Sequence, residues 1–302
     1  MSGRPDARTL LEVQDFFQLP SPALVEKDWN VVRTLAAIQD AASDGLTLAF
    51  GGGTALGRAY GLLDRMSEDI DLRIVGQASS RGALQRFRRQ VNERLEAAGF
   101  NLDGRVNVKQ ADRYVRYDLP YDPAMRGEGI LRPEIKIELA AFPVRRPVEF
   151  RPVRSFVAQA HDRDAEVASI ACVPLVETAA EKFVALTRRQ GAVYAGAERD
   201  PTLVRHVYDL MRLDGRYDLD DAAALALETM ASDTDRGHAA YKADPLAETL
   251  LTTDRLWRDE AFATDYANLM RDMVYGDRPS FSDAIAAVQS FGARLKRLGL
   301  DE

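Results

Sequence analysis

The chain has 302 residues, of which 46% are hydrophobic and 29% are charged, a balance typical of a soluble globular protein with one large or two ordinary domains. No run approaches eighteen consecutive apolar residues, and the first residues lack a signal-peptide pattern, so we expect no membrane partner. A single cysteine, Cys172, excludes internal disulfides and thiolate zinc sites. These features favour a cytoplasmic protein.

The formal net charge of −7 is unevenly distributed. Residues 81–160 contain sixteen Lys and Arg against ten Asp and Glu, hence +6, whereas residues 201–302 contain twelve against nineteen, hence −7. A polyanion should therefore meet the middle of the chain. The first candidate contacts lie on a predicted basic helix over 82–98 and are Arg86, Arg88, Arg89 and Arg94. The alternative is that these arginines form an ordinary solvated helix face. The second candidates are Arg113, Arg116 and Arg126.

Residues 8–42 predict two helices, a short amphipathic one over 9–17 and a longer one that begins at Ser21 or Pro22. The run Glu26-Lys27-Asp28 lies in the longer helix. A polar helix face explains this run as well as a substrate contact does, so it receives no role.

A glycine turn follows the first predicted strand, residues 46–50. Gly51, Gly52 and Gly53 permit a close approach of backbone amides to a phosphate. Thr54 stands at a helix N-cap position, ahead of a predicted helix that extends to residue 63. A helix N-terminus aimed at an anion favours phosphate binding.

The next predicted strand, residues 69–75, carries two aspartates on one face. Asp69 and Asp71 share that face because strand side chains alternate with period two, while the apolar residues between them face the other way. Two neighbouring carboxylates repel each other unless a cation lies between them. Carboxylate oxygens together with substrate phosphates are typical ligands of Mg²⁺. Strand, glycines, helix and Asp-x-Asp strand together indicate a metal-dependent phosphoryl-transfer site.

Further strands are predicted within 100–119 and over 132–139, 147–150 and 153–157. The 132–139 strand alternates strictly, which places Glu134, Lys136 and Glu138 on one face. The chain beyond Pro174 reads as helical, with a loop over 190–201. Its predicted helices cover 176–189, 204–213, 220–232, 245–258, 261–275 and 280–299. We place a domain boundary between residues 172 and 173.

The residue pattern of these motifs resembles that of one branch of the nucleotidyltransferase superfamily that includes DNA polymerase beta. Phe50-Gly51-Gly52-Gly53-Thr54-Ala55-Leu56 and Arg65-Met66-Ser67-Glu68-Asp69-Ile70-Asp71-Leu72 are similar to the AbiEii/AbiGii family, the nucleotidyltransferase toxins of type IV toxin–antitoxin and abortive-infection systems. The later segments 181–189 and 205–210 resemble that family too, although His206 stands where an acid is usual. The resemblance covers nearly the whole chain.

The family implies an α/β (α+β) fold, with a small mixed nucleotidyltransferase sheet, flanking helices and a mostly helical C-terminal lobe. It implies the catalytic residues Asp69, Asp71, Glu138, Lys182 and Asp209, with Glu134 as the alternative third carboxylate. It implies nucleotide binding by Gly52, Gly53, Thr54, Ser67, Lys182 and Arg189, and Mg²⁺ on Asp69 and Asp71, with Mn²⁺ as the alternative metal. Asp209 has a second interpretation, holding Lys182 in place.

The implied reaction transfers a nucleoside monophosphate from an NTP to RNA, at the 3′ end of tRNA, and so blocks translation. A cognate antitoxin protein is the implied partner. Two alternatives stay open: a transferase that places AMP on a protein hydroxyl, and a non-catalytic nucleotide-binding regulator. Base preference, acceptor identity and the antitoxin are not encoded in any motif.

Overall fold

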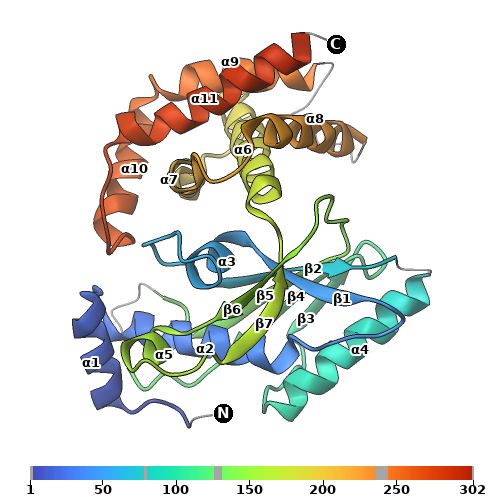
Figure 1. The fold of residues 1–302 in the computed structure, drawn as a ribbon, viewed down its shortest axis with the longest axis vertical. Helices are drawn as coiled ribbons and strands as arrows, with labels where there is room; N and C mark the ends of the chain where they lie inside the picture. Colours follow the sequence, from blue (N-terminus) through green and yellow to red (C-terminus); the bar gives the residue numbers. More distant parts are fainter. Residues whose placement is uncertain (1–2, 78–79, 126–130, 236–243, 301–302) are drawn as a thin grey trace. The chain divides into compact units, whose positions relative to one another are not determined.

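The computed structural model describes residues 3–77, 80–125, 131–235 and 244–300. The chain folds into two compact units, Met1–Val173 and Pro174–Glu302 (Figure 1). In the described residues, the first unit holds a sheet with five helices, and the named elements of the second unit are all helices. No helix within the described ranges is long and apolar enough to cross a membrane.

The first unit is built on a mixed seven-stranded sheet with the order β3-β4-β5-β2-β1-β7-β6. Its two central neighbours, β1 and β2, are antiparallel, while β2 pairs with β5 and β1 with β7 in parallel. The other neighbours along the sheet are antiparallel. The strands are β1 (Thr47–Gly51), β2 (Asp69–Val75), β3 (Val106–Lys109), β4 (Tyr114–Pro120), β5 (Glu134–Ala140), β6 (Glu149–Val153) and β7 (Val167–Cys172).

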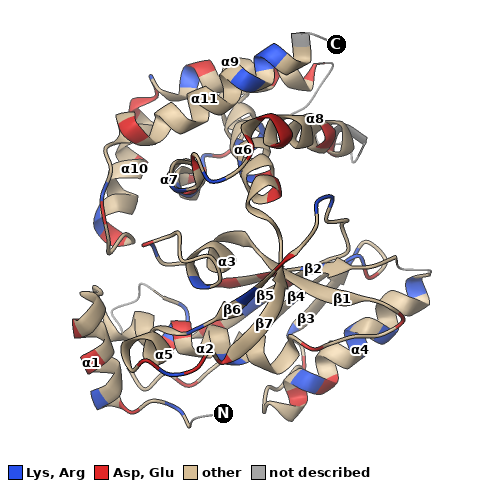
Figure 2. Ribbon diagram, in the orientation of Figure 1, with Lys and Arg blue, Asp and Glu red and all other residues tan. Residues whose placement is uncertain are grey.

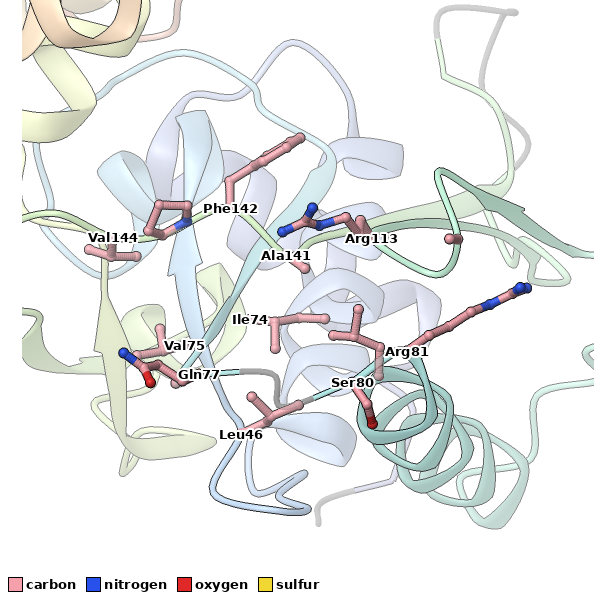
Figure 3. A pocket seen from close by; sticks show the side chains of 14 residues that line it. Leu46, Ile74, Val75, Gln77, Ser80, Arg81, Arg113, Ala141, Phe142 and Val144 are labelled. Atoms are coloured by element: carbon pink, nitrogen blue, oxygen red, sulfur yellow. The ribbon is translucent and has the colours of Figure 1, made fainter. Parts of the chain in front are cut away.

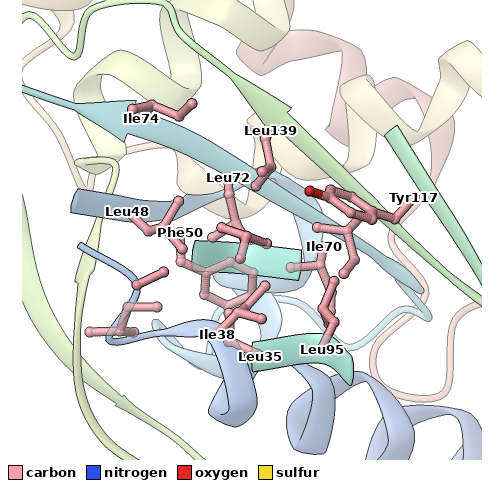
Figure 4. Packing of buried hydrophobic residues seen from close by; sticks show 14 of the residues in the cluster. Leu35, Ile38, Leu48, Phe50, Ile70, Leu72, Ile74, Leu95, Tyr117 and Leu139 are labelled. Atoms are coloured by element: carbon pink, nitrogen blue, oxygen red, sulfur yellow. The ribbon is translucent and has the colours of Figure 1, made fainter. Parts of the chain in front are cut away.

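The core of the first unit lies on one face of this sheet. Strands β2 and β5 alternate between buried and half-buried positions, so their apolar side chains point to one face. There they pack with buried residues of α2 (Pro22–Ile38) and α4 (Arg81–Ala97), including Leu35 and Leu95 (Figure 4). Helices α2 and α4 therefore cover one face and leave the polar side chains on the other. Helices α1 (Ala7–Phe17), α3 (Gly52–Arg58) and α5 (Phe156–Ala160) complete this unit.

The second unit packs its helices around α6 (Leu175–Tyr194), which contacts α7, α8 and α9. The rings of Phe183 in α6 and Phe291 in α11 stack with centroids 4.2 Å apart. The remaining helices are α7 (Val204–Leu213), α8 (Leu219–Asp235), α9 (Pro245–Leu256), α10 (Glu260–Asp272) and α11 (Phe281–Leu300), with a short 3₁₀ helix at Pro201–Leu203.

Three sequence predictions of local structure are wrong. Thr54 is not the N-cap of α3, because that helix begins at Gly52, has Gly51 at its N-cap and ends at Arg58 rather than near residue 63. The predicted 153–157 strand is instead the end of β6 and the start of α5, where the Ser155 hydroxyl caps the helix by accepting from Ala158 N. The predicted loop over 190–201 begins five residues later, because α6 continues to Tyr194.

Candidate active site

The parallel pairing of β2 with β5 aligns the predicted carboxylates on one face of the sheet. Asp71 lies opposite Glu138 and Asp69 lies opposite Lys136. Side chains at paired positions of neighbouring strands project to the same face. Asp69, Asp71 and Glu138 are therefore brought together, as the sequence predicts, whereas Glu134 lies at the start of β5 beside Arg132, 3.8 Å from its Nη1.

Lys136, which the sequence analysis left without a role, lies among these carboxylates. Its Nζ is 2.5 Å from Glu138 Oε1 and 3.7 Å from Asp69 Oδ2. Burial lowers the pKa of Lys136, but its hydrogen bond to Glu138 and the neighbouring acidic charges raise that pKa by more, so the ammonium stays protonated. Burial, reinforced by the charges of Glu68 and Glu138, raises the pKa of Asp69.

Tyr114, on β4, is a second group that the motifs did not reveal. Burial, together with the charge of Glu138 and a hydrogen bond with it, raises the pKa of Tyr114 to about 12. The phenol is therefore neutral at physiological pH and can donate to the Glu138 carboxylate. In the β4–β5 register Glu138 lies opposite Arg116, and Tyr114, two positions before Arg116 on the same face, is its diagonal neighbour.

The glycine turn gives the Asp71 carboxylate its space. Gly52 has φ +71°, and a Cβ on it would come within 2.0 Å of Asp71 Oδ2. A Cβ on Gly53 would come within 2.7 Å of Arg65 Nη2 and 2.8 Å of Ser67 Oγ. Gly52 therefore requires glycine for both backbone and steric reasons, whereas a side chain at position 53 would displace the ends of the Arg65 and Ser67 side chains.

Thr54 and Ser67 connect α3 to the start of β2. The Thr54 hydroxyl donates to Asp69 O at 2.6 Å and lies 3.0 Å from Ser67 Oγ. Thr54 is buried, and Ser67 is half-buried. The structure thus shows a positioning contact for Thr54, while phosphate binding by either residue stays a prediction.

The Glu26-Lys27-Asp28 run is buried rather than a polar helix face. Lys27 Nζ lies 3.0 Å from Glu68 Oε2 and donates to the carbonyls of Arg132 (3.0 Å) and Glu134. Its ammonium therefore connects the residue before β2 to the start of β5. These two strands carry the carboxylates. Charged side chains are almost never fully buried unless paired, so burial was not predictable from this polar run.

The flanking acids of that run hold other segments. Asp28 accepts from Phe156 N at 2.7 Å and forms a 2.7 Å ion pair with Arg58, the last residue of α3. Glu26 accepts from Ala124 N and Met125 N. Helix α2 is thus attached through three consecutive residues to the segments surrounding the site.

In the second unit, Lys182 and Asp209 form a buried ion pair. Lys182 Nζ donates to Asp209 Oδ2 at 2.6 Å, between α6 and α7, and the Asp209 side chain is fully buried. This contact agrees with the interpretation in which Asp209 holds Lys182. Arg189, two turns further along α6, is half exposed and pairs with Asp200. Catalytic or nucleotide-binding roles for these residues stay predictions.

The arginines of α4 are mostly engaged in contacts within the first unit. Arg86 pairs with Asp44 at 2.8 Å, Arg88 lies 3.1 Å from the buried Asp112, and Arg94 donates to Asp40 O at 2.9 Å. Blue and red bands alternate toward the C-terminal half of this helix (Figure 2). These contacts favour the interpretation of α4 as a solvated helix face. Arg126 lies outside the described residues.

Asp69 and Asp71 are the residues that could hold a divalent cation together with ligands from a substrate. In the described part of the chain, no three His, Cys, Asp or Glu side chains gather closely enough to enclose a metal by themselves. Asp69, Asp71 and Glu138 nevertheless present carboxylate oxygens on one face, and the Lys136 ammonium already stands beside two of them as a cation. Mg²⁺ needs only one or two carboxylates when water and substrate phosphates supply its other ligands.

Residues 33–288 match the family model described as nucleotidyl transferase AbiEii toxin, type IV TA system. A comparison with curated proteins gave no match. Among solved structures, the fold is similar to MenT4, a nucleotidyltransferase toxin from Mycobacterium tuberculosis H37Rv, with a TM-score of 0.61 and 19% sequence identity over 95% of this chain and 89% of that chain.

The family match spans well over half of the chain and contains the glycine turn, the Asp pair, Glu138, Lys182 and Asp209. The similarity to MenT4 supports the mixed α/β fold over nearly the full length. Membership in this family implies an antitoxin partner. The chain therefore belongs to the AbiEii nucleotidyltransferase toxins of type IV toxin–antitoxin systems.

Proposed function

We propose that this chain transfers a nucleoside monophosphate from an NTP to the 3′ end of an RNA, with tRNA as the acceptor and Mg²⁺ as the metal, and thereby blocks translation. The observation that carries the proposal is the Asp69–Asp71 pair, held opposite Glu138 and against Gly52 on one sheet face. The position of Gly52 beside Asp71 would bring bound phosphates and carboxylates together.

The reaction forms one bond and breaks one. An RNA hydroxyl oxygen attacks the α-phosphorus of the NTP, and the bond from that phosphorus to the bridging oxygen of the β-phosphate breaks, so that pyrophosphate leaves with the electron pair. Glu138 releases its contact with Lys136 and accepts the hydroxyl proton. Mg²⁺ held by Asp69 and Asp71 would supply charge neutralisation at the α-phosphate.

A labelling experiment tests the proposal. The protein is incubated with each α-labelled NTP, Mg²⁺ and total cellular RNA, and label is followed into RNA and into protein. We expect label in RNA, centred on tRNA, and none after removal of the metal by a chelator. Label in protein alone would replace this proposal with protein modification, and label in neither would favour a nucleotide-binding regulator.

The Asp pair supplies the matched variant. Asp71→Asn retains the shape of the side chain beside Gly52 but removes its charge, so we expect loss of label incorporation with no loss of thermal stability, since carboxylate repulsion is relieved. Near wild-type incorporation in Asp71→Asn would refute the metal-binding role of this residue.

A further inference from the structure

A cavity of about 790 Å³ lies at the far end of β2 from the Asp pair. Its volume falls within the range of about 300–1,000 Å³ that is common for small-ligand sites. Its floor is apolar and includes the buried side chains of Leu46, Ile74 and Leu84. Ala141 lies beside Ile74 (Figure 3). A ligand with a flat apolar part would cover this floor.

The rim of the cavity carries an aromatic ring and a cation. Arg113 is exposed, and Figure 3 shows its side chain directed toward Phe142 across Ala141. The Arg113 side chain forms no hydrogen bond or ion pair with any residue that the structure describes. Arg81 also lines the cavity, but its guanidinium points away in Figure 3 and pairs with Asp112 at 3.1 Å. Arg113 is therefore the rim cation available to a ligand.

Arg73 connects this cavity to the carboxylates. It follows Asp71 by two positions in β2, so both side chains project from the same face. Its guanidinium carbon lies 5.6 Å from the centroid of the Phe142 ring. From Asp71 to Val75 the strand advances about 13 Å, at ~3.3 Å per residue. Arg73 and Phe142 therefore lie on the carboxylate side, whereas the floor residues Ile74 and Leu84 belong to the core on the other face, so the cavity lies at the end of the sheet, beyond the strand that carries the Asp pair.

We propose that this cavity binds one unpaired nucleotide of the acceptor RNA, with its base against Phe142 and the apolar floor and its phosphate on Arg113. Unpaired bases are recognised by stacking on aromatic rings and guanidinium planes, and phosphates by Arg. Stacked, paired bases of an A-form duplex cannot enter such a cavity. The proposal rests on the proposed transfer to RNA and adds the place where the acceptor strand is held.

The position favours the acceptor over the NTP. The glycine turn and the Asp pair lie at one end of β1 and β2, since Gly51 pairs with Asp71, whereas the cavity lies at the other end, near Val75. An NTP with its phosphates at the glycine turn would leave the cavity to a second ligand. An RNA strand with its 3′ hydroxyl at Glu138 would reach the cavity with an earlier nucleotide.

Binding of a short fluorescein-labelled single-stranded RNA to the full chain, measured by anisotropy without NTP, tests this proposal. Phe142→Ala should weaken binding about 5- to 100-fold. Phe142→Leu, which keeps apolar volume and guards against misfolding, should weaken it similarly. Arg113→Ala should lower the slope of log affinity against log salt by about 0.7, the value for one phosphate contact in single strands. Arg89→Ala, which removes one exposed charge on α4, is the matched control and should leave the slope unchanged.

Wild-type RNA affinity in both Phe142→Leu and Arg113→Ala would overturn the proposal. So would weaker NTP binding with unchanged RNA binding, which would assign the cavity to the base of the NTP. A blunt duplex of the same sequence should bind wild type and Phe142→Leu equally, and a loss with the duplex as large as with the single strand also contradicts the proposal. Since no NTP is present, this binding pattern can hold even if the labelling experiment shows no transfer to RNA, so the two failures are distinguishable.

Discussion

Gly52 allows a test of how closely the glycine turn and the Asp pair depend on each other. Gly52→Ala combines a left-handed backbone, φ +71°, with a Cβ that would overlap Asp71 Oδ2. We expect at least about a tenfold loss of transfer activity, or ~1.4 kcal/mol in transition-state stabilisation, because Asp71 must move. Label incorporation into RNA measures it.

Gly61→Ala is the control for that variant. Gly61 has φ +66° but nothing within 4 Å of an added Cβ, so it isolates backbone strain from overlap with Asp71. Strain alone should cost about 1–2 kcal/mol of unfolding free energy and leave transfer intact. Equal activity losses in Gly52→Ala and Gly61→Ala would show that overlap with Asp71 is unimportant.

Cys172 should be chemically silent in the folded protein. Its side chain is fully buried in β7, and burial raises the pKa of the thiol to about 12, so almost no thiolate exists at neutral pH. We expect a chromogenic thiol reagent to react with Cys172 only after denaturant is added. Rapid, complete reaction in native buffer would indicate that β7 opens readily.

At the scale of elements, Lys27 makes α2 part of the site's framework. The ammonium contacts Glu68 ahead of β2 and two carbonyls at the start of β5. Lys27→Met should cost about 2–4 kcal/mol of unfolding free energy, because buried carbonyls lose their donor. It should lower kcat more than it raises KM for the NTP, because β2 and β5, which carry the carboxylates, lose the contact that connects their starts.

Lys109→Met is the matched control for Lys27→Met, since Lys109 is an exposed lysine of β3 in the same unit. It should change neither quantity measurably. Chemical denaturation and steady-state kinetics give both values. A Lys27→Met protein with normal stability and normal kcat would show that the Lys27 contacts between α2, β2 and β5 are not needed for stability or catalysis.

Elements were predictable from sequence where one pattern acted alone. Strict alternation in β2 and β5 predicted both strands and the shared face of Asp69 and Asp71, whereas the position of Glu138 facing them was implied by the family resemblance and follows from the β2–β5 register. Strand β7 was missed because its residues are small and its exposure is irregular, while its burial comes from pairing with β1 and β6. Pairing between strands that are distant in the sequence cannot be predicted from local residue patterns.

Two errors have different causes, one local and one tertiary. The segment after Val153 alternates like a strand, yet Ser155 caps α5, a cue that competes with alternation. The last turn of α6 persists because Tyr194 donates to Asp259 at 3.0 Å, sixty-five positions away. The contacts of Lys27 with Glu68 and of Lys136 with Asp69 likewise join segments that are distant in the sequence.

At the scale of the whole molecule, the division after Val173 has a consequence for the isolated first unit. A chain ending at residue 173 retains β7, which lies between β1 and β6 in the sheet. A chain ending at residue 165 loses β7, which exposes the inner edge of β1 and leaves β6 without its only partner strand among the described residues. Unpaired edges promote aggregation.

We therefore expect the 1–173 fragment to be soluble and to unfold cooperatively, whereas 1–165 should aggregate. The 1–173 fragment should also be inactive in the labelling experiment if Lys182 and Asp209 have their predicted catalytic roles, because both belong to the second unit. Circular dichroism during heating and light scattering measure folding, and α-labelled NTP measures transfer. Full activity of 1–173 would remove Lys182 from the catalytic residues. A folded, soluble 1–165 fragment would show that the sheet does not need β7 to bury the apolar face of β1.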